Sequence, residues 1–258
     1  MKHLRAILRL CALVLWTLAF AVVHLVLRIS IFFHEPLSLT LQCFCFRQWA
    51  RGAALVMGMR IRVEGRPPRA PFILVSNHLS YMDIVLLATQ VDAVFVAKSE
   101  VAGWPLIGPL ARSLNTIFVD RTSRADVPRV LESMENILSA GHGVVFFPEG
   151  TSSDGQDVLR FKSALFDAPI RLGCPVHAAA VGYRTPAGWP PASVSVCWWG
   201  DMTFSDHVYR LLQLPFFVGQ VTFGEGVPAH PDRRSFADAT REAVKRGFTP
   251  VPAQRGMG

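Results

Sequence analysis

Short apolar runs alternate with longer segments of helical periodicity through most of the chain. The runs are typical of buried strands, and they lie at 72–76, 93–97, 116–119, 143–147, 175–181 and 193–199. The segments between them predict helices at 81–90, 103–113, 124–140 and 159–168. Strands that alternate with helices in this way predict an α/β domain, in which a mixed sheet is flanked by helices.

The N-terminal part is apolar over a much longer distance. Residues 10–27 are almost wholly apolar, and Arg9 and Arg28 flank them, so the run approaches the ~20 residues that cross a bilayer. Two interpretations compete: a retained membrane anchor, or a signal peptide cleaved after Ala19-Phe20-Ala21. The apolar run continues beyond that tripeptide, which favours the anchor.

A second apolar stretch, 37–59, contains Arg47, Gln48 and Arg51. Such side chains are costly at a bilayer centre. This stretch is therefore expected to lie in the membrane interface or to pack on the first helix as a hairpin. The chain is thus divided into a membrane-associated helical segment at 1–60, a folded domain at 61–248, and a tail at 249–258 that is expected to be disordered.

Composition and charge support contact with a membrane. The chain is 51% hydrophobic, with a mean hydropathy of +0.32. Residues 1–62 hold eight Lys and Arg and one Glu, so the whole net charge of +7 lies there and the rest of the chain is neutral. A neutral body argues against nucleic-acid binding. Basic residues before the apolar run instead predict an inner-membrane protein with its body on the cytoplasmic face.

The five cysteines are odd in number, and no C-x-x-C occurs. This pattern favours neither a disulfide framework nor a zinc site, and it indicates a reducing compartment.

The sequence NHLSYMDIV follows the strand at 72–76 and carries candidate chemistry. Asp83 has a structural interpretation, because Ser80 and Asp83 form the S-x-x-D pattern of a helix capping box. It also has a catalytic one, because a strand-to-helix turn can bring its carboxylate against His78. A carboxylate on one ring nitrogen fixes the tautomer and leaves the other nitrogen as a base. No G-x-S-x-G element supplies a protein nucleophile, so the hydroxyl that His78 activates would belong to a substrate.

A polar loop, FPEGTSSDG at 147–155, follows another apolar strand. Gly150 permits close approach of the backbone to a ligand, and Thr151 offers a hydroxyl. Sites in α/β sheets lie beyond the carboxyl ends of the strands. The loop is therefore expected at the same edge of the sheet as His78.

Four sequence blocks together resemble the glycerolipid acyltransferases, the lysophosphatidic-acid-acyltransferase-like enzymes. NHLSYMD has their N-H-x4-D form, and three further blocks follow in the family's order: TIFVDR at 116–121, VVFFPEGT at 144–151 and CPVHAAAV at 174–181. The resemblance covers about residues 60–225, and it makes 61–248 the expected acyltransferase domain.

The resemblance implies roles for seven residues. His78 would be the general base and Asp83 its orienting partner. The implied substrate-binding residues are Lys98, Arg121, Glu149, Gly150 and Thr151. Arg121 has a plainer interpretation as a surface ion-pair residue.

The resemblance also implies the reaction. A fatty acyl group would pass from acyl-CoA or acyl carrier protein to the free hydroxyl of a lysophospholipid, without a metal or redox cofactor. The first expectation for the acceptor is 1-acyl-sn-glycerol-3-phosphate, which would give phosphatidic acid in phospholipid biosynthesis. However, Ser152 stands where the family often has Arg, so another lysolipid, such as lyso-ornithine lipid, is the alternative.

Two other classes of protein are alternatives. A secreted lipid hydrolase would need a nucleophile that the sequence does not show. A non-catalytic lipid-binding membrane protein would leave the pairing of His78 with Asp83 to chance.

Overall fold

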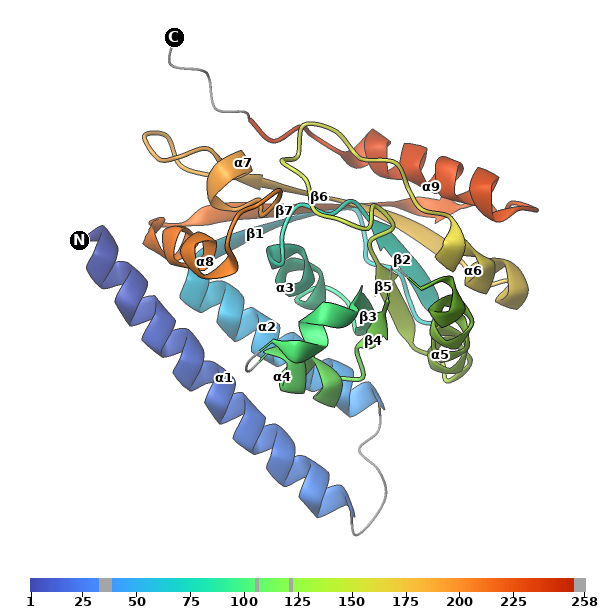
Figure 1. Ribbon diagram of the computed structural model, residues 1–258, viewed down its shortest axis with the longest axis horizontal. Helices are drawn as coiled ribbons and strands as arrows, with labels where there is room; N and C mark the ends of the chain where they lie inside the picture. The colour runs from blue at the N-terminus through green and yellow to red at the C-terminus, as the bar shows by residue number, and fades with distance from the viewer. Residues whose placement is uncertain (33–38, 105–106, 121–122, 253–258) are drawn as a thin grey trace.

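Seven strands form one mixed sheet in the computed structural model, which describes residues 1–32, 39–104, 107–120 and 123–252 (Figure 1). Their order across the sheet is β1-β7-β6-β2-β5-β3-β4, and all neighbours are parallel except β6 and β7. The strands are β1 Met59–Glu64, β2 Phe72–Ser76, β3 Ala93–Lys98, β4 Ile117–Val119, β5 Gly143–Phe146, β6 Val176–Arg184 and β7 Phe217–Val227.

Helices cover both faces of this sheet. The α-helices are α1 Lys2–Phe32, α2 Leu39–Met57, α3 Met82–Ala88, α4 Ile107–Ser113, α5 Val127–Ser139, α6 Asp167–Leu172, α7 Ala192–Ser195, α8 Phe204–Gln213 and α9 Arg233–Gly247. Short 3-10 helices lie at Ser99–Gly103, Arg124–Asp126 and Ala164–Phe166.

Two hydrophobic cores separate the helices from the sheet. Neighbouring residues of β2 point to opposite faces: Leu74 packs with α2, α3 and α8, and Ile73 packs with α5, α6 and α9. Every residue of β2 is buried, as expected for a central parallel strand covered on both faces. The predicted α/β architecture, a mixed sheet flanked by helices, is therefore confirmed.

One predicted strand is wrong. Residues 193–199 alternate like a strand, but α7 occupies Ala192–Ser195 and no strand follows it there. Pro190 and Pro191 precede this segment; proline lacks the N–H of a strand ladder and favours the start of a helix. The N–H groups of Val196 and Cys197 then bond the Ala192 carbonyl at 3.0 and 2.8 Å.

Other predicted boundaries also move. The helix expected at 159–168 is replaced by the 3-10 turn at Ala164–Phe166 and by α6. The strand pattern of β7 and the helices α8 and α9 were not predicted. The boundary expected between residues 60 and 61 falls inside β1, which pairs with β7 over Met59–Glu64.

The tail begins later than expected. Val251 is only 2% exposed; its N–H donates to the Gly155 carbonyl at 2.8 Å, and its carbonyl accepts from Gln156 Nε2 at 2.8 Å. Gly155 has φ +80°, and a side chain there would collide with Val251. Disorder is therefore wrong for 249–252, while residues 253–258 lie outside the described part.

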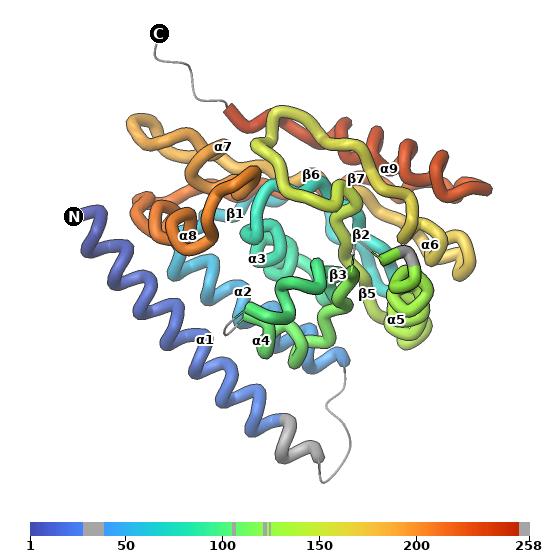
Figure 2. Tube along the Cα trace, in the orientation of Figure 1, coloured from blue at the N-terminus to red at the C-terminus, as the bar shows by residue number. Residues whose placement is uncertain are grey.

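The first two helices pack side by side (Figure 2). Trp16 Nε1 donates to the Trp49 carbonyl at 3.0 Å, and Trp49 Nε1 donates to Thr17 Oγ1 at 3.2 Å. A Cβ on Gly52 would lie 2.3 Å from the Trp16 ring, so glycine is needed for this close approach. The arrangement agrees with the hairpin alternative for 37–59, although residues 33–38 lie outside the described part.

Within the described residues, one helical segment is long and apolar enough to cross a membrane, Lys2–Leu27 of α1. Most of its large apolar side chains are exposed in the protein alone. Its first turns are nevertheless attached to the folded body, because Arg5 and Arg9 donate to carbonyls at the end of α8. These bonds reach Gln213 at 2.9 Å, Leu214 at 2.6 Å and Pro215 at 3.0 Å.

Candidate active site

Two polar loops meet at one edge of the sheet. One follows β2 and the other follows β5, and these parallel strands are direct neighbours, with Val75 opposite Phe146. Their carboxyl ends therefore lie together. The expectation that FPEGTSSDG lies beside His78 is confirmed: Ser153 N–H donates to the His78 carbonyl at 3.0 Å, and the Phe147 ring stacks on the His78 ring at 4.4 Å between centroids.

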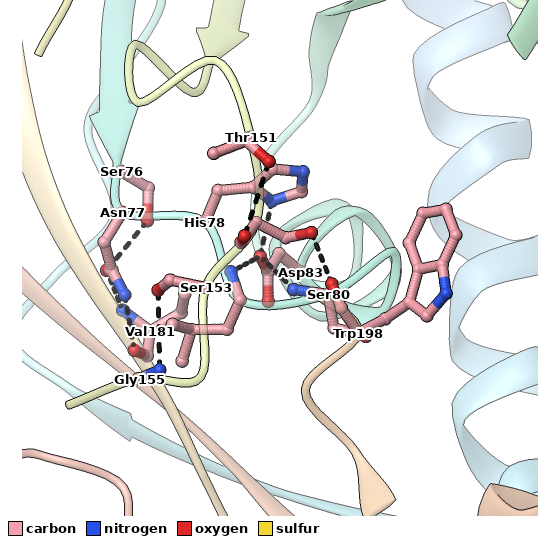
Figure 3. Close-up of polar contacts among 12 residues, drawn as sticks. Ser76, Asn77, His78, Ser80, Asp83, Thr151, Ser153, Gly155, Val181 and Trp198 are labelled. Carbon is pink, nitrogen blue, oxygen red and sulfur yellow. Dashed lines mark hydrogen bonds and ion pairs between the residues drawn. The ribbon is translucent and has the colours of Figure 1, made fainter. Parts of the chain in front are cut away.

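His78 and Asp83 point toward each other across the turn into α3 (Figure 3). His78 Nδ1 lies 2.7 Å from Asp83 Oδ2. The same oxygen accepts the N–H of Leu79 at 2.7 Å and the N–H of Ser80 at 3.0 Å. Asp83 thus combines the two roles considered from the sequence, because it caps the turn and also contacts the imidazole.

The surroundings of the pair fix its chemistry. Asp83 is fully buried, while the His78 side chain keeps 17% of its surface exposed. A carboxylate accepts only, so Nδ1 is the ring nitrogen that carries the hydrogen. Nε2, on the other side of the ring, is then left as the basic nitrogen.

Asn77 holds the loop in place. It is fully buried, and its side-chain amide pairs with the backbone of Val181 on β6. Nδ2 donates to the carbonyl at 3.0 Å, and Oδ1 accepts the N–H at 2.8 Å. Since β2 ends at Ser76, this side chain replaces the next rung of the ladder and fixes the position of His78.

Glu149 is a buried carboxyl group beside the pair. It is 4% exposed, and Oε1 accepts the Leu159 N–H at 3.2 Å. Burial raises the pKa of Glu149 to about 8, opposed by hydrogen bonds from the backbone of Leu159 and His78. At neutral pH the group is therefore mostly protonated.

The backbone turns sharply at Gly150, where φ is +75°. A Cβ at this position would lie 2.7 Å from Lys162 Nζ. The Lys162 ammonium therefore lies against the loop at Gly150. Thr151, the next residue, is exposed. Ser152 turns the other way, and its hydroxyl donates to the Trp198 carbonyl.

The chain is similar to known acyltransferases. A family model described as Acyltransferase matches residues 60–182. A lyso-ornithine lipid O-acyltransferase from Rhodobacter capsulatus is 36% identical over 201 residues, which are 75% of this chain and 71% of that protein. The chain belongs to the acyltransferase family. A 1-acyl-sn-glycerol-3-phosphate acyltransferase from Neisseria gonorrhoeae is 31% identical over 196 residues, 75% of each chain.

The fold of this acyltransferase is shared with a solved structure. The crystal structure of the 1-acyl-sn-glycerophosphate acyltransferase PlsC from Thermotoga maritima matches with a TM-score of 0.66. The match covers 96% of both chains at 23% identity.

The remaining predicted site residues are less closely grouped. Lys98 ends β3, and its Nζ forms an exposed ion pair with Glu100 Oε1 at 2.5 Å. Its charge is therefore engaged locally, and its role in binding stays a prediction. Arg121 lies outside the described residues. Within the described part of the acyltransferase, no group of three or more His, Cys, Asp or Glu could hold a metal ion.

Two residues of the site were missed from the sequence. Asn77 belongs to the N-H-x4-D block, but its pairing with Val181 depends on which strand lies next to β2. Tyr183 lies two residues beyond the fourth block, and its hydroxyl donates to Asp83 Oδ1 at 2.6 Å. No local pattern indicates either contact.

Proposed function

We propose that this acyltransferase moves a fatty acyl group from an acyl thioester to the free hydroxyl of a lysolipid. The observation that carries the proposal is the pair formed by His78 and Asp83, with Nδ1 held by the buried carboxylate and Nε2 left as the base. The thioester is already activated, so no acyl-enzyme is required.

The reaction follows from this arrangement. His78 Nε2 takes the proton of the acceptor hydroxyl as its oxygen attacks the thioester carbonyl. The tetrahedral intermediate then collapses, the C–S bond breaks, and the proton passes from His78 to the departing thiolate. A positioned base of this kind contributes about 10²–10⁴-fold in rate, and alignment of the two substrates supplies much of the remainder.

The test is His78→Ala. The variant should lose nearly all acyl transfer but stay folded, because Asp83 keeps its bonds to Leu79, Ser80 and Tyr183. His142→Ala is the matched control, since His142 precedes β5 and lies at the opposite edge of the sheet. Near-normal turnover by folded His78→Ala would overturn the mechanism.

Lyso-ornithine lipid is the favoured acceptor. The relative from Rhodobacter capsulatus carries that name, and position 152 supports the same choice. A serine stands there in place of the arginine expected to meet a phosphate, and it bonds the Trp198 backbone. Lys162 places a cation against Gly150 of the loop, which suits the carboxylate of a zwitterionic head group.

The second candidate is 1-acyl-sn-glycerol-3-phosphate, the acceptor expected first from the sequence blocks. It is supported by the similarity to the Neisseria gonorrhoeae enzyme. An acceptor panel separates the two: the full chain in membranes, with labelled palmitoyl-CoA or palmitoyl-acyl carrier protein and each lysolipid in turn. Transfer to lyso-ornithine lipid that exceeds transfer to the phosphate acceptor supports the first choice, and the reverse order overturns it.

We also propose that α1 holds the enzyme on the cytoplasmic face of the inner membrane. The exposed apolar surface of α1 and α2 supports this, with Leu15, Val22 and Leu55 all more than half exposed. Burial of such surface in lipid is favourable by about 25 cal/mol per Å².

A further inference from the structure

A buried hydroxyl contacts the far side of the Asp83 carboxylate. Oδ2 receives His78 Nδ1 and two backbone N–H groups, whereas Oδ1 receives the hydroxyl of Tyr183 at 2.6 Å. Among the hydrogen bonds of the described residues, this is the one that reaches Oδ1. We propose that Tyr183 is a positioning residue for acyl transfer, whose hydroxyl holds the Asp83 carboxylate in the orientation that leaves His78 Nε2 free to accept the proton of the acceptor hydroxyl.

The inference rests on the proposed function, in which His78 is the base. It adds a third member to the pair, 100 residues away in sequence. Tyr183 does not reach the open end of the imidazole, so it acts through Asp83 and not on the substrate.

The sheet explains how Tyr183 arrives at this place. β6 runs alongside β2 as far as Ala179, opposite Ser76, and then continues to Arg184. Asn77 pairs with Val181 on this extension. Residues 181 and 183 are two apart in the strand and therefore share a face. The pairing of Asn77 with Val181, which fixes the His78 loop, therefore also fixes Tyr183 next to Asp83.

Burial makes the hydroxyl necessary. Tyr183 is 1% exposed and Asp83 is fully buried, and a buried carboxylate needs donors to offset its lost hydration. Burial, and then the nearby Asp83, raise the pKa of Tyr183 well above its ordinary value, so its oxygen keeps the proton and donates. The ring of Tyr183 packs against Phe217 in the core. A phenylalanine at position 183 could make that contact, so packing alone does not require the hydroxyl.

Other titratable groups face this cluster. They are Tyr81 at the start of α3, Cys197 after α7, and Glu149 in the loop after β5. Burial raises the pKa of both Tyr81 and Cys197, so these two are neutral across the working range. Burial raises the pKa of Glu149 to about 8, and Glu149 is present in both the wild type and a Tyr183 variant.

The hydroxyl also affects how the negative charge is distributed between the two carboxylate oxygens of Asp83. Its hydrogen bond draws negative charge toward Oδ1, away from the imidazole. Without it, Asp83 would hold the Nδ1 proton more tightly and favour the imidazolium form of His78.

The experiment is Tyr183→Phe in the full chain, assayed with palmitoyl-CoA and lyso-ornithine lipid, or with whichever acceptor the panel identifies. We expect kcat to fall about tenfold near neutral pH and the acidic limb of its pH profile to move up by about one unit. KM for palmitoyl-CoA should stay unchanged. Tyr209→Phe is the control, because that hydroxyl contacts His3 on α1, and it should leave the profile unmoved.

A double-mutant cycle separates positioning from packing. If Tyr183 acts through Asp83, removing its hydroxyl has little further effect on kcat in the Asp83→Asn background. A full tenfold loss in both backgrounds overturns the proposal. Should Tyr183→Phe fail to fold, the double variant is compared with Asp83→Asn alone, since neither buries an uncompensated charge.

The two proposals fail in different ways. Activity that survives in folded His78→Ala overturns the proposed mechanism. An inactive His78→Ala together with a wild-type rate and pH profile for Tyr183→Phe overturns only the role of Tyr183.

Discussion

At the scale of single residues, the site contains two buried carboxyl groups in different surroundings. Asp83 receives four hydrogen bonds, from two backbone N–H groups, His78 and Tyr183. Glu149 is held by backbone donors on one oxygen only, and burial raises its pKa to about 8. The two environments give the carboxyl groups different roles: Asp83 accepts hydrogen bonds as a carboxylate, whereas protonated Glu149 can donate one.

Glu149 should make stability depend on pH in a defined direction. Its pKa is about 8 in the folded chain against 4.5 ordinarily, so between those values the folded state holds a proton that the unfolded state lacks. The free energy of unfolding should therefore fall as pH rises from about 5 to 8, by an amount on the order of a few kcal/mol. Glu149→Gln should flatten this slope in chemical denaturation.

The matched control is Glu132→Gln, an exposed position on α5. It should keep the wild-type slope. Equal slopes for the wild type and Glu149→Gln would show that Glu149 ionises normally in the folded chain.

At the scale of elements, α1 is attached to α8 by arginine. Arg9 donates to the carbonyls of Leu214 and Pro215, and Arg5 donates to that of Gln213. Cations at a helix C-terminus satisfy its orphan carbonyls and its dipole. From the sequence alone, these two residues were expected only to set the orientation in the membrane.

Arg9→Ala should weaken this attachment. Hydrogen bonds from a charged group contribute about 1.5–3 kcal/mol, and about 2–4 °C in Tm is expected per kcal/mol for a domain of this size. The Tm of detergent-solubilised protein should therefore drop by several degrees. Arg51→Ala, which removes the same charge from an exposed position of α2, should change it little, and equal shifts for both variants would contradict the docking role.

The strands show which local sequence patterns were sufficient to predict a strand. Central strands such as β2 and β5 were predicted because continuous burial makes their sequences almost wholly apolar. β7 was not predicted, because Gly219, Gly224 and Gly226 interrupt its pattern. The segment 193–199 has the alternation of a strand, but the two prolines before it begin a helix instead.

At the scale of the whole molecule, the membrane attachment can be tested directly. Apolar burial is insensitive to salt, whereas attraction between exposed charges is screened within about 8–10 Å at physiological ionic strength. The intact chain should therefore stay in the membrane fraction at high salt and be released by detergent. Full release by salt alone would indicate a protein bound by surface charge.

The site was predictable where it is local in sequence, and where two loops both follow the carboxyl ends of strands. His78 and Asp83 lie five residues apart, so a strand-to-helix turn was enough to bring them together. Asn77 with Val181, and Tyr183 with Asp83, join segments about 100 residues apart. Those contacts follow from the pairing of β2 with β6, and that register is set by the whole sheet.

The contact between Val251 and Gly155 bears on the order of events during synthesis. A ribosome releases the chain from its N-terminus, so the apolar helix α1 emerges long before Val251. The loop that carries Glu149 and Thr151 lacks this support until then. A nascent chain can therefore reach a bilayer through α1 while the loop at 147–155 still lacks its contact with Val251.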